Sequence, residues 1–167
     1  MVWDGIVAPM NLRLVQLPHP ARGSLLLSAM PGRFESLLDF EEQARAAGLA
    51  MIVCLTQRNE VDGLSPEYAL AIRERALPCE WMNVPIPNFG VPADADAFRD
   101  AIELVAARVR SGDRVLLHCA AGIGRTGSAA ACVLKSLGLG TADALKRVRD
   151  AGSNPENAAQ SGFVDWF

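Results

Sequence analysis

The chain has 167 residues, of which 50% are hydrophobic, and its formal net charge is −3. This length and composition are enough for one sizeable core, so we expect residues 1–167 to form a single domain. A slightly acidic chain with no apolar run near the roughly 20 residues of a membrane span is not expected to bind nucleic acid or membranes, and we expect it to be cytoplasmic.

The hydrophobic pattern predicts strands that alternate with helices, because short apolar runs favour strands and apolar residues at helical spacing favour helices. In chain order we expect strands at Leu12–Val15 and Leu25–Ser28, a helix at Ser36–Ala47, a strand at Met51–Leu55, a helix at Tyr68–Ala76, a strand at Trp81–Val84, a helix at Asp94–Arg110, a strand at Arg114–His118, and helices at Thr126–Leu137, Thr141–Arg149 and Pro155–Phe167. We therefore predict an α/β fold with a mostly parallel central sheet flanked by helices. Thr141 is expected to cap the helix that it begins.

A glycine-rich segment joins the last predicted strand to the helix that follows it, and reads His-Cys-Ala-Ala-Gly-Ile-Gly-Arg-Thr-Gly over residues 118–127. At the N-terminus of a helix the backbone N–H groups have no helical partners, and the helix dipole favours an anion. We expect this loop to bind phosphate through the residues that follow its cysteine, namely Ala120, Ala121, Gly122, Ile123, Gly124 and Arg125.

The same loop carries the residues for a nucleophilic reaction. The field of the helix N-terminus lowers the pKa of the Cys119 thiol, and the thiolate is the form that attacks. Arg125 offers a planar fork for two phosphate oxygens, and Thr126 can donate its hydroxyl to the sulfur when the sulfur is the leaving group. His118 is expected to support the loop rather than to act as a base, because a thiolate needs no base.

On these residues the chain resembles the cysteine-dependent protein phosphatases, whose signature is His-Cys, two residues, Gly, two residues, Arg, Ser or Thr, Gly. Residues 27–32, 54–60, 85–87 and 160–167 are similar to the dual-specificity phosphatases of the kinase-associated type. The resemblance implies a dual-specificity phosphatase-like fold and hydrolysis of phosphomonoesters through a phosphocysteine on Cys119. A chain this short implies a shallow site, which would admit phosphoserine and phosphothreonine as well as phosphotyrosine.

The main departure from these families follows Pro87. The families carry an aspartic acid there, which protonates the leaving oxygen and later deprotonates the attacking water, whereas this chain has Asn88. An amide does not transfer a proton in this way, and general acid catalysis is typically worth about 10²–10⁴-fold. Unless another acid substitutes, we expect turnover to suffer most for alkyl phosphates and least for aryl phosphates.

Three carboxylates are candidates for the missing acid. Asp94 and Asp96 lie close after Asn88, but they also fit the first turn of the next predicted helix, where the dipole favours carboxylates. Glu156 lies four residues before Gln160, which matches a glutamine that helps to position water in the resembling families. Glu156 either lies near the mouth of the site or is a first-turn carboxylate of the last helix.

The remaining reactive side chains carry weaker signals. Arg58 and Glu60 could border the pocket, although solvated loop charges are the favoured interpretation, and His19 between two prolines fits an exposed loop. The other cysteines have no metal or disulfide spacing and are expected to be small apolar fillers: Cys54, Cys79 and Cys132. We expect no metal and no cofactor.

Two functions remain open from the sequence. The first is an active phosphatase that acts on a phosphorylated protein or a small phosphomonoester. The second is a phosphate-recognising binding module in which Asn88 leaves turnover negligible. Retention of Cys119, Arg125 and Thr126 favours the enzyme, since binding alone needs no nucleophile. A lipid phosphatase is disfavoured because the loop brings no lysine to a polyanionic headgroup.

Overall fold

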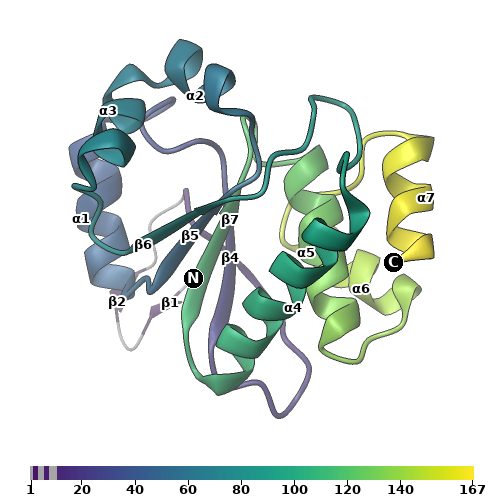
Figure 1. Cartoon of the computed structure of the whole chain (residues 1–167). Coiled ribbons are helices and arrows are strands. Elements are labelled where there is room, and N and C mark those ends of the chain that lie inside the picture. Colours follow the sequence, from purple (N-terminus) through teal and green to yellow (C-terminus); the bar gives the residue numbers. More distant parts are fainter. Residues whose placement is uncertain (1, 4–5, 8–10) are drawn as a thin grey trace.

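The computed structural model describes residues 2–3, 6–7 and 11–167, and its centre is one five-stranded sheet with the order β3-β4-β7-β5-β6 (Figure 1). Its strands are β3 (Arg13–Val15), β4 (Ser24–Ser28), β5 (Met51–Cys54), β6 (Glu80–Asn83) and β7 (Arg114–His118). All neighbouring pairs are parallel except β3 with β4. The predicted, mostly parallel sheet is therefore confirmed. A short antiparallel pair, β1 (Val2–Trp3) with β2 (Ile6–Val7), forms a second sheet.

Helices cover both faces of the five-stranded sheet (Figure 1). The group on one face comprises α1 (Leu37–Ala47), α2 (Arg58–Leu64) and α3 (Pro66–Glu74). The group on the opposite face comprises α4 (Ala95–Ser111), α5 (Gly124–Ser136), α6 (Thr141–Asp150) and α7 (Ala158–Trp166). Strand residues alternate between the two cores, as period two requires. Leu116 packs with the α1 side, whereas Val115 and Leu117 pack with α4 and α5. None of the helices in the described ranges is long and apolar enough to cross a membrane.

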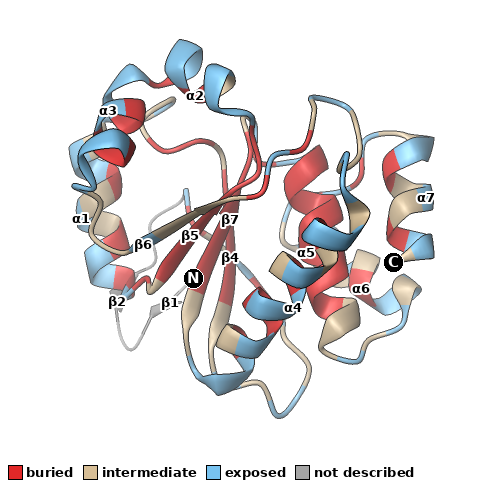
Figure 2. Cartoon of the chain, viewed as in Figure 1, coloured by how far each residue is buried: buried red, intermediate tan, exposed pale blue. Residues whose placement is uncertain are grey.

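Helix α5 is the most deeply buried helix, as Figure 2 shows, and every residue from Gly124 to Leu134 is buried. It packs against α4, α6 and α7 and against the end of β7. Its small side chains, including three consecutive alanines at 129–131, let these neighbours approach closely. The helix that opens at the glycine-rich loop is thus held on all sides, so the loop has a rigid base.

The structure corrects several predicted helix limits. Helix α2 was not predicted, because Val61 is its only buried residue and an apolar period is absent. The signal for it was local: the Glu60 carboxylate accepts a hydrogen bond from the Gln57 N–H at 3.2 Å, which caps the helix start. Thr141 is the first residue of α6, and the N-cap is Gly140 rather than Thr141.

The last helix begins three residues later than predicted. Its N-cap is Asn157, whose side chain accepts a hydrogen bond from the Gln160 N–H at 3.0 Å. Glu156 therefore precedes the helix, and the interpretation of Glu156 as a first-turn carboxylate is wrong.

Candidate functional site

The glycine-rich loop lies between the end of the central strand β7 and the start of α5, as predicted. Gly122 has a φ of +78°, and a Cβ there would lie 2.5 Å from the Ser28 carbonyl at the end of β4. Gly127 faces the opposite wall, where a Cβ would lie 2.5 Å from the Asn154 nitrogen. Only glycine adopts the positive φ of position 122 without strain, and neither position 122 nor position 127 has room for a side chain. The loop is therefore wedged between β4 and the segment before α7.

The backbone carbonyls of the loop are held from outside. Arg33 Nη1 donates to the Ala120 oxygen at 2.8 Å, and the Met30 N–H donates to the same oxygen at 3.3 Å. By contrast, within the described part of the chain, no acceptor is recorded for the N–H groups of Ala120, Ala121 and Ile123. Unpartnered N–H groups beside a helix N-terminus form a concave anion site.

Cys119 lies at the floor of this concavity. Burial raises the pKa of its thiol, but hydrogen bonds from Thr126 and Gly122 and the charge of Arg125 outweigh burial, so the pKa is lowered. The Gly122 N–H lies 3.2 Å from the sulfur. The Thr126 hydroxyl is buried and makes no hydrogen bond of ideal geometry, yet it is close enough to lower this pKa, so its proton can turn toward the sulfur.

The Arg125 guanidinium is held in a fixed orientation at the cavity. Its guanidinium donates to both oxygens of Glu60, at 2.7 and 3.2 Å, and to the Ile86 carbonyl at 3.1 Å. Only 3% of the Arg125 side chain is exposed, so this ion pair fixes the fork. Glu60 therefore borders the site, while Arg58 lines a separate cavity and stacks over Trp81 at 5.2 Å.

His118 links the loop to the α3 side of the sheet. Its Nδ1 lies 3.1 Å from the Cys119 carbonyl, which only accepts, so Nδ1 carries the proton. Its Nε2 then accepts from the Tyr68 hydroxyl at 2.9 Å, and Tyr68 accepts from Trp81 Nε1 at 2.9 Å. Burial lowers the pKa of His118 to about 4. The imidazole is therefore neutral, and hydrogen bonds at both of its nitrogens connect the loop to Tyr68.

This pKa predicts a specific loss of stability in acid. The unfolded chain protonates His118 below about pH 6.5, while the folded protein resists protonation down to about pH 4. Stability is therefore lost as pH falls through this window, by roughly 2 kcal/mol between about pH 7 and about pH 5. Urea unfolding at the two pH values measures the loss.

The matched variants are His118→Gln and His19→Gln, since His19 is an exposed turn residue. The first should remove this part of the pH dependence and the second should retain it. An unchanged pH dependence in His118→Gln would show that the imidazole is not held neutral by the fold.

A cavity of about 360 Å³ opens over Cys119. Its lining joins loop residues to side chains from distant segments: Arg33, Glu60, Leu64, Asn88, Phe89, Cys119, Ala120, Ala121, Gly124, Arg125, Glu156 and Gln160. Three of the predicted candidates, Asn88, Glu156 and Gln160, are thus brought together with the cysteine.

The other two candidates lie outside this cavity. Asp94 is the N-cap of α4, where its Oδ1 accepts from the Ala97 N–H at 3.0 Å, and Asp96 is exposed in the first turn. Both positions are those that carboxylates favour at a helix start. Of the two interpretations of Asp94 and Asp96, the structure thus agrees with the helix start and not with a replacement acid in the cavity.

Glu156 is held beside the loop by Gln160. Gln160 is buried; its Oε1 accepts from the Glu156 N–H at 2.8 Å and its Nε2 donates to the Gly90 carbonyl at 3.2 Å. The Glu156 side chain lies against the loop, since a Cβ on Gly124 would be 2.6 Å from Glu156 Cδ. Within the described residues, no partner is recorded for its carboxylate. Gln160 therefore positions the backbone of Glu156.

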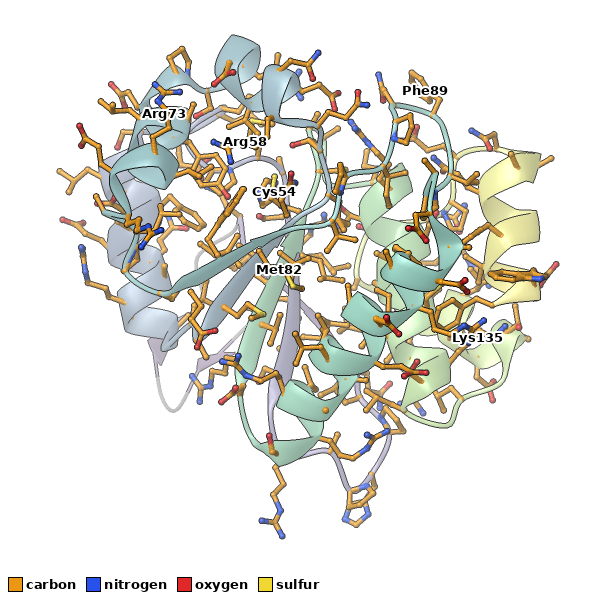
Figure 3. All side chains as sticks on the ribbon, viewed as in Figure 1. Cys54, Arg58, Arg73, Met82, Phe89 and Lys135 are labelled. Carbon is orange, nitrogen blue, oxygen red and sulfur yellow. The ribbon has the colours of Figure 1, made fainter. Side chains whose placement is uncertain are left out.

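Asn88 lies in a turn that closes over the cavity. The Gly90 N–H donates to the Pro87 carbonyl at 2.8 Å, and Phe89 has a φ of +57°, which is uncommon for a residue with a side chain. Asn157 Nδ2 donates to the Phe89 carbonyl at 2.8 Å and ties this turn to the start of α7. Figure 3 shows Phe89 at the outer tip of the turn. The residue is 63% exposed.

Residues 31–162 match the model of the Swiss Army Knife protein, DSP-PTPase phosphatase domain (PTP-SAK). The chain belongs to this family. The predicted relationship to the dual-specificity branch of the cysteine-dependent phosphatases is thereby confirmed.

Solved structures and a curated relative agree with this placement. The fold is similar to that of kinase-associated phosphatase (KAP) with its catalytic-site cysteine replaced by serine, with a TM-score of 0.81, 20% identity, and coverage of 93% of this chain and 92% of that chain. Tk-PTP in the active form has a TM-score of 0.69 and 27% identity over 89% of this chain and 97% of that chain. Tyrosine-protein phosphatase 1 of Caenorhabditis elegans is 32% identical over an alignment of 98 residues, and the match covers 53% of this chain and only 10% of the relative.

The remaining cysteines of this phosphatase domain differ chemically from Cys119. Burial raises the pKa of Cys54, that of Cys79 to about 11 and that of Cys132 to about 12. All four cysteines are free thiols. A thiol with a raised pKa is a poor nucleophile, so these three fit the predicted role of small apolar fillers.

Sequence reasoning missed the residues that hold the loop from outside it. Arg33, Arg13 and Ser153 all donate to loop carbonyls. They lie outside the signature, and two arginines and a serine among many carry no local signal. Glu60, in contrast, was named from the sequence as a residue that could border the pocket, and its capping position in α2 places it there.

Proposed function

We propose that the chain is a phosphomonoester hydrolase, a protein-tyrosine or dual-specificity phosphatase that works through a phosphocysteine on Cys119. The observation that carries this proposal is a thiol of lowered pKa at the floor of a loop with unpartnered N–H groups. The oriented fork of Arg125 lies beside it. A nucleophile, an anion site and a planar cation in one cavity suit phosphoryl transfer.

The reaction follows from these positions in two steps. The Cys119 thiolate attacks phosphorus, the P–S bond forms, and the P–O bond to the leaving group breaks as that oxygen takes a proton. Water then attacks phosphorus and gives up a proton, the P–S bond breaks, and inorganic phosphate leaves. Arg125 and the loop N–H groups hold the other phosphate oxygens throughout, and Thr126 stabilises the departing sulfur.

Glu156 is the group that we assign to the proton transfers. It is the carboxylate of the cavity without a recorded partner among the described residues, since Glu60 is bound to Arg125. Gln160 fixes its backbone, and its carboxyl lies against Gly124 of the loop. In its protonated form it can protonate the leaving oxygen, and as the carboxylate it can then accept the proton of the attacking water.

Replacing this acid should change rates according to the leaving group. Glu156→Gln is expected to lower kcat/KM on an alkyl phosphate by about 10²-fold and on an aryl phosphate by much less, because phenolate leaves without a proton and kcat/KM covers the reaction only up to the phosphocysteine. Asn88→Asp in the Glu156→Gln background should recover part of the alkyl rate. An unchanged ratio of alkyl to aryl rates in Glu156→Gln would remove Glu156 from this role.

The proposed substrates are phosphorylated proteins or small phosphomonoesters. The exposed apolar side chains of Leu64 and Phe89 line the cavity, whose floor is polar. Apolar walls above a polar floor suit a substrate in which an aromatic ring carries the phosphate. The C. elegans relative is named a tyrosine-protein phosphatase, which agrees with phosphotyrosine as one substrate.

Asn88 is the observation that favours the second candidate, a phosphate-binding module with little turnover. Purified protein incubated with p-nitrophenyl phosphate separates the two functions. We expect turnover that vanadate inhibits, and acid quenching should trap phosphate on Cys119, as peptide mass spectrometry would show. Vanadate binding without turnover and without a trapped intermediate would instead establish the binding module.

A further inference from the structure

The Gly122 carbonyl, on the outer side of the catalytic loop, receives two short hydrogen bonds. Arg13 Nη2 donates to it at 2.6 Å, and Ser153 Oγ donates to it at 2.6 Å. Arg13 is on the edge strand β3, 109 positions from Gly122 in the sequence. Two separate segments thus converge on a single peptide group of the loop.

The Arg13 guanidinium is fixed by further hydrogen bonds to the segment that follows α6. Its Nη1 donates to the Ala151 carbonyl at 2.7 Å and to Ser153 Oγ at 2.9 Å, so its fork spans the loop and the end of α6. A Cβ on Gly152, whose φ is +88°, would lie 2.8 Å from Arg13 Nη1. The guanidinium therefore lies directly against the backbone of the connection between α6 and α7.

Holding this carbonyl sets the direction of the next N–H. In a planar trans peptide the C=O and the following N–H point in opposite directions. Because the Gly122 oxygen is held on the outside, the Ile123 N–H is turned toward the concavity, and within the described residues no acceptor is recorded for it. The orientation of one anion-binding N–H thus depends on Arg13 and Ser153.

The charge of Arg13 also reaches the nucleophile. Burial lowers the pKa of Arg13, while the Cys119 thiolate raises it, so cation and thiolate interact. The other titratable or charged groups near Cys119 are the neutral His118 and four residues that line the same cavity: Arg33, Glu60, Arg125 and Glu156. Arg125 faces the cavity, whereas Arg13 acts from behind the loop.

We propose that Arg13 is a positioning residue of this active site: from β3 it fixes the Gly122–Ile123 peptide in the orientation that binds the phosphoryl group and supports the Cys119 thiolate. The inference rests on the proposed phosphatase function for its meaning. Its tests use vanadate binding and thiol alkylation, which do not require turnover.

The central comparison is between Arg13→Met, Arg13→Lys and a control, Arg147→Met. Arg147 lies on α6 and donates to the Gln16 carbonyl at 3.2 Å, so its loss removes a similar contact to the β3 side without touching the loop. The dissociation constant of vanadate and the pH dependence of Cys119 alkylation by iodoacetamide are measured for each protein.

Arg13→Met should weaken vanadate binding by about tenfold and raise the apparent pKa of Cys119 by about one. Arg13→Lys should restore most of the thiol acidity but little of the vanadate affinity, because lysine keeps the charge without the planar fork. Arg147→Met should match the wild type in both. Wild-type values in Arg13→Met would overturn the proposal, and so would equal effects in Arg147→Met.

If Arg13→Met does not fold, Ser153→Ala tests the proposal instead, because it removes the second hydrogen-bond donor to the Gly122 carbonyl oxygen. A loss of vanadate affinity of at least about threefold is then expected, and an unchanged affinity would overturn the proposal. If the wild type binds vanadate but hydrolyses no phosphomonoester, the phosphatase function fails while the role of Arg13 in the loop is still measured.

Discussion

Cys119→Ser is expected to lower kcat on an aryl phosphate by about 10⁴-fold or more while phosphate binding stays within a few-fold of the wild type. The serine hydroxyl would occupy the place of the sulfur, but it does not ionise under the conditions that produce the thiolate. The anion site would persist, because its N–H groups and Arg125 do not depend on the sulfur.

The measurement pairs steady-state kinetics with calorimetric titration of inorganic phosphate. Cys132→Ser is the matched control, because it makes the same change at a buried thiol in α5 outside the cavity. Its kcat should remain near that of the wild type. Residual turnover in Cys119→Ser within tenfold of the wild type would mean that water, and not this cysteine, attacks phosphorus.

Arg125→Lys is expected to lower kcat/KM by about 10³-fold, the second-largest effect. Lysine retains the charge but not the planar fork, so it follows the equatorial oxygens through the transition state poorly. In the wild type Glu60 accepts two hydrogen bonds from Arg125. In the variant it would have only the flexible lysine ammonium as a donor. Part of the loss should therefore appear in kcat as well as in KM.

Arg58→Lys provides the comparison for Arg125→Lys, because Arg58 lies two residues from Glu60 but lines a different cavity. Figure 3 shows it beneath α2, near Cys54. Its kcat/KM should stay within about twofold of the wild type. A loss in Arg125→Lys no larger than this would show that the fork is not engaged with the phosphoryl group.

The replacement of the usual aspartic acid by Asn88 could be predicted from the sequence, but the group that takes over its role could not. The sequence predicted that the acid was missing and named Glu156, Asp94 and Asp96 as replacements, but each also fitted a helix start. The choice depended on where α7 begins. Its first residue is Ala158 rather than Pro155, because the side chain of the N-cap residue Asn157 accepts a hydrogen bond from the Gln160 N–H. A shift of three residues thus separates Glu156 from the helix and places it in the cavity.

The amino-acid sequence by itself determined what depends on neighbours along the chain: the apolar strand β7, the glycine turn after it, the helix that opens there, and the nucleophile at their junction. Only the tertiary structure decided which distant groups complete the site. Glu60 forms an ion pair with Arg125, 65 positions away in the sequence, and Arg13 donates a hydrogen bond to the Gly122 carbonyl, 109 positions away. The physical reason is that propensity, capping and glycine conformations act within a few residues, whereas ion pairs and carbonyl anchors form only after the sheet has brought its strands together.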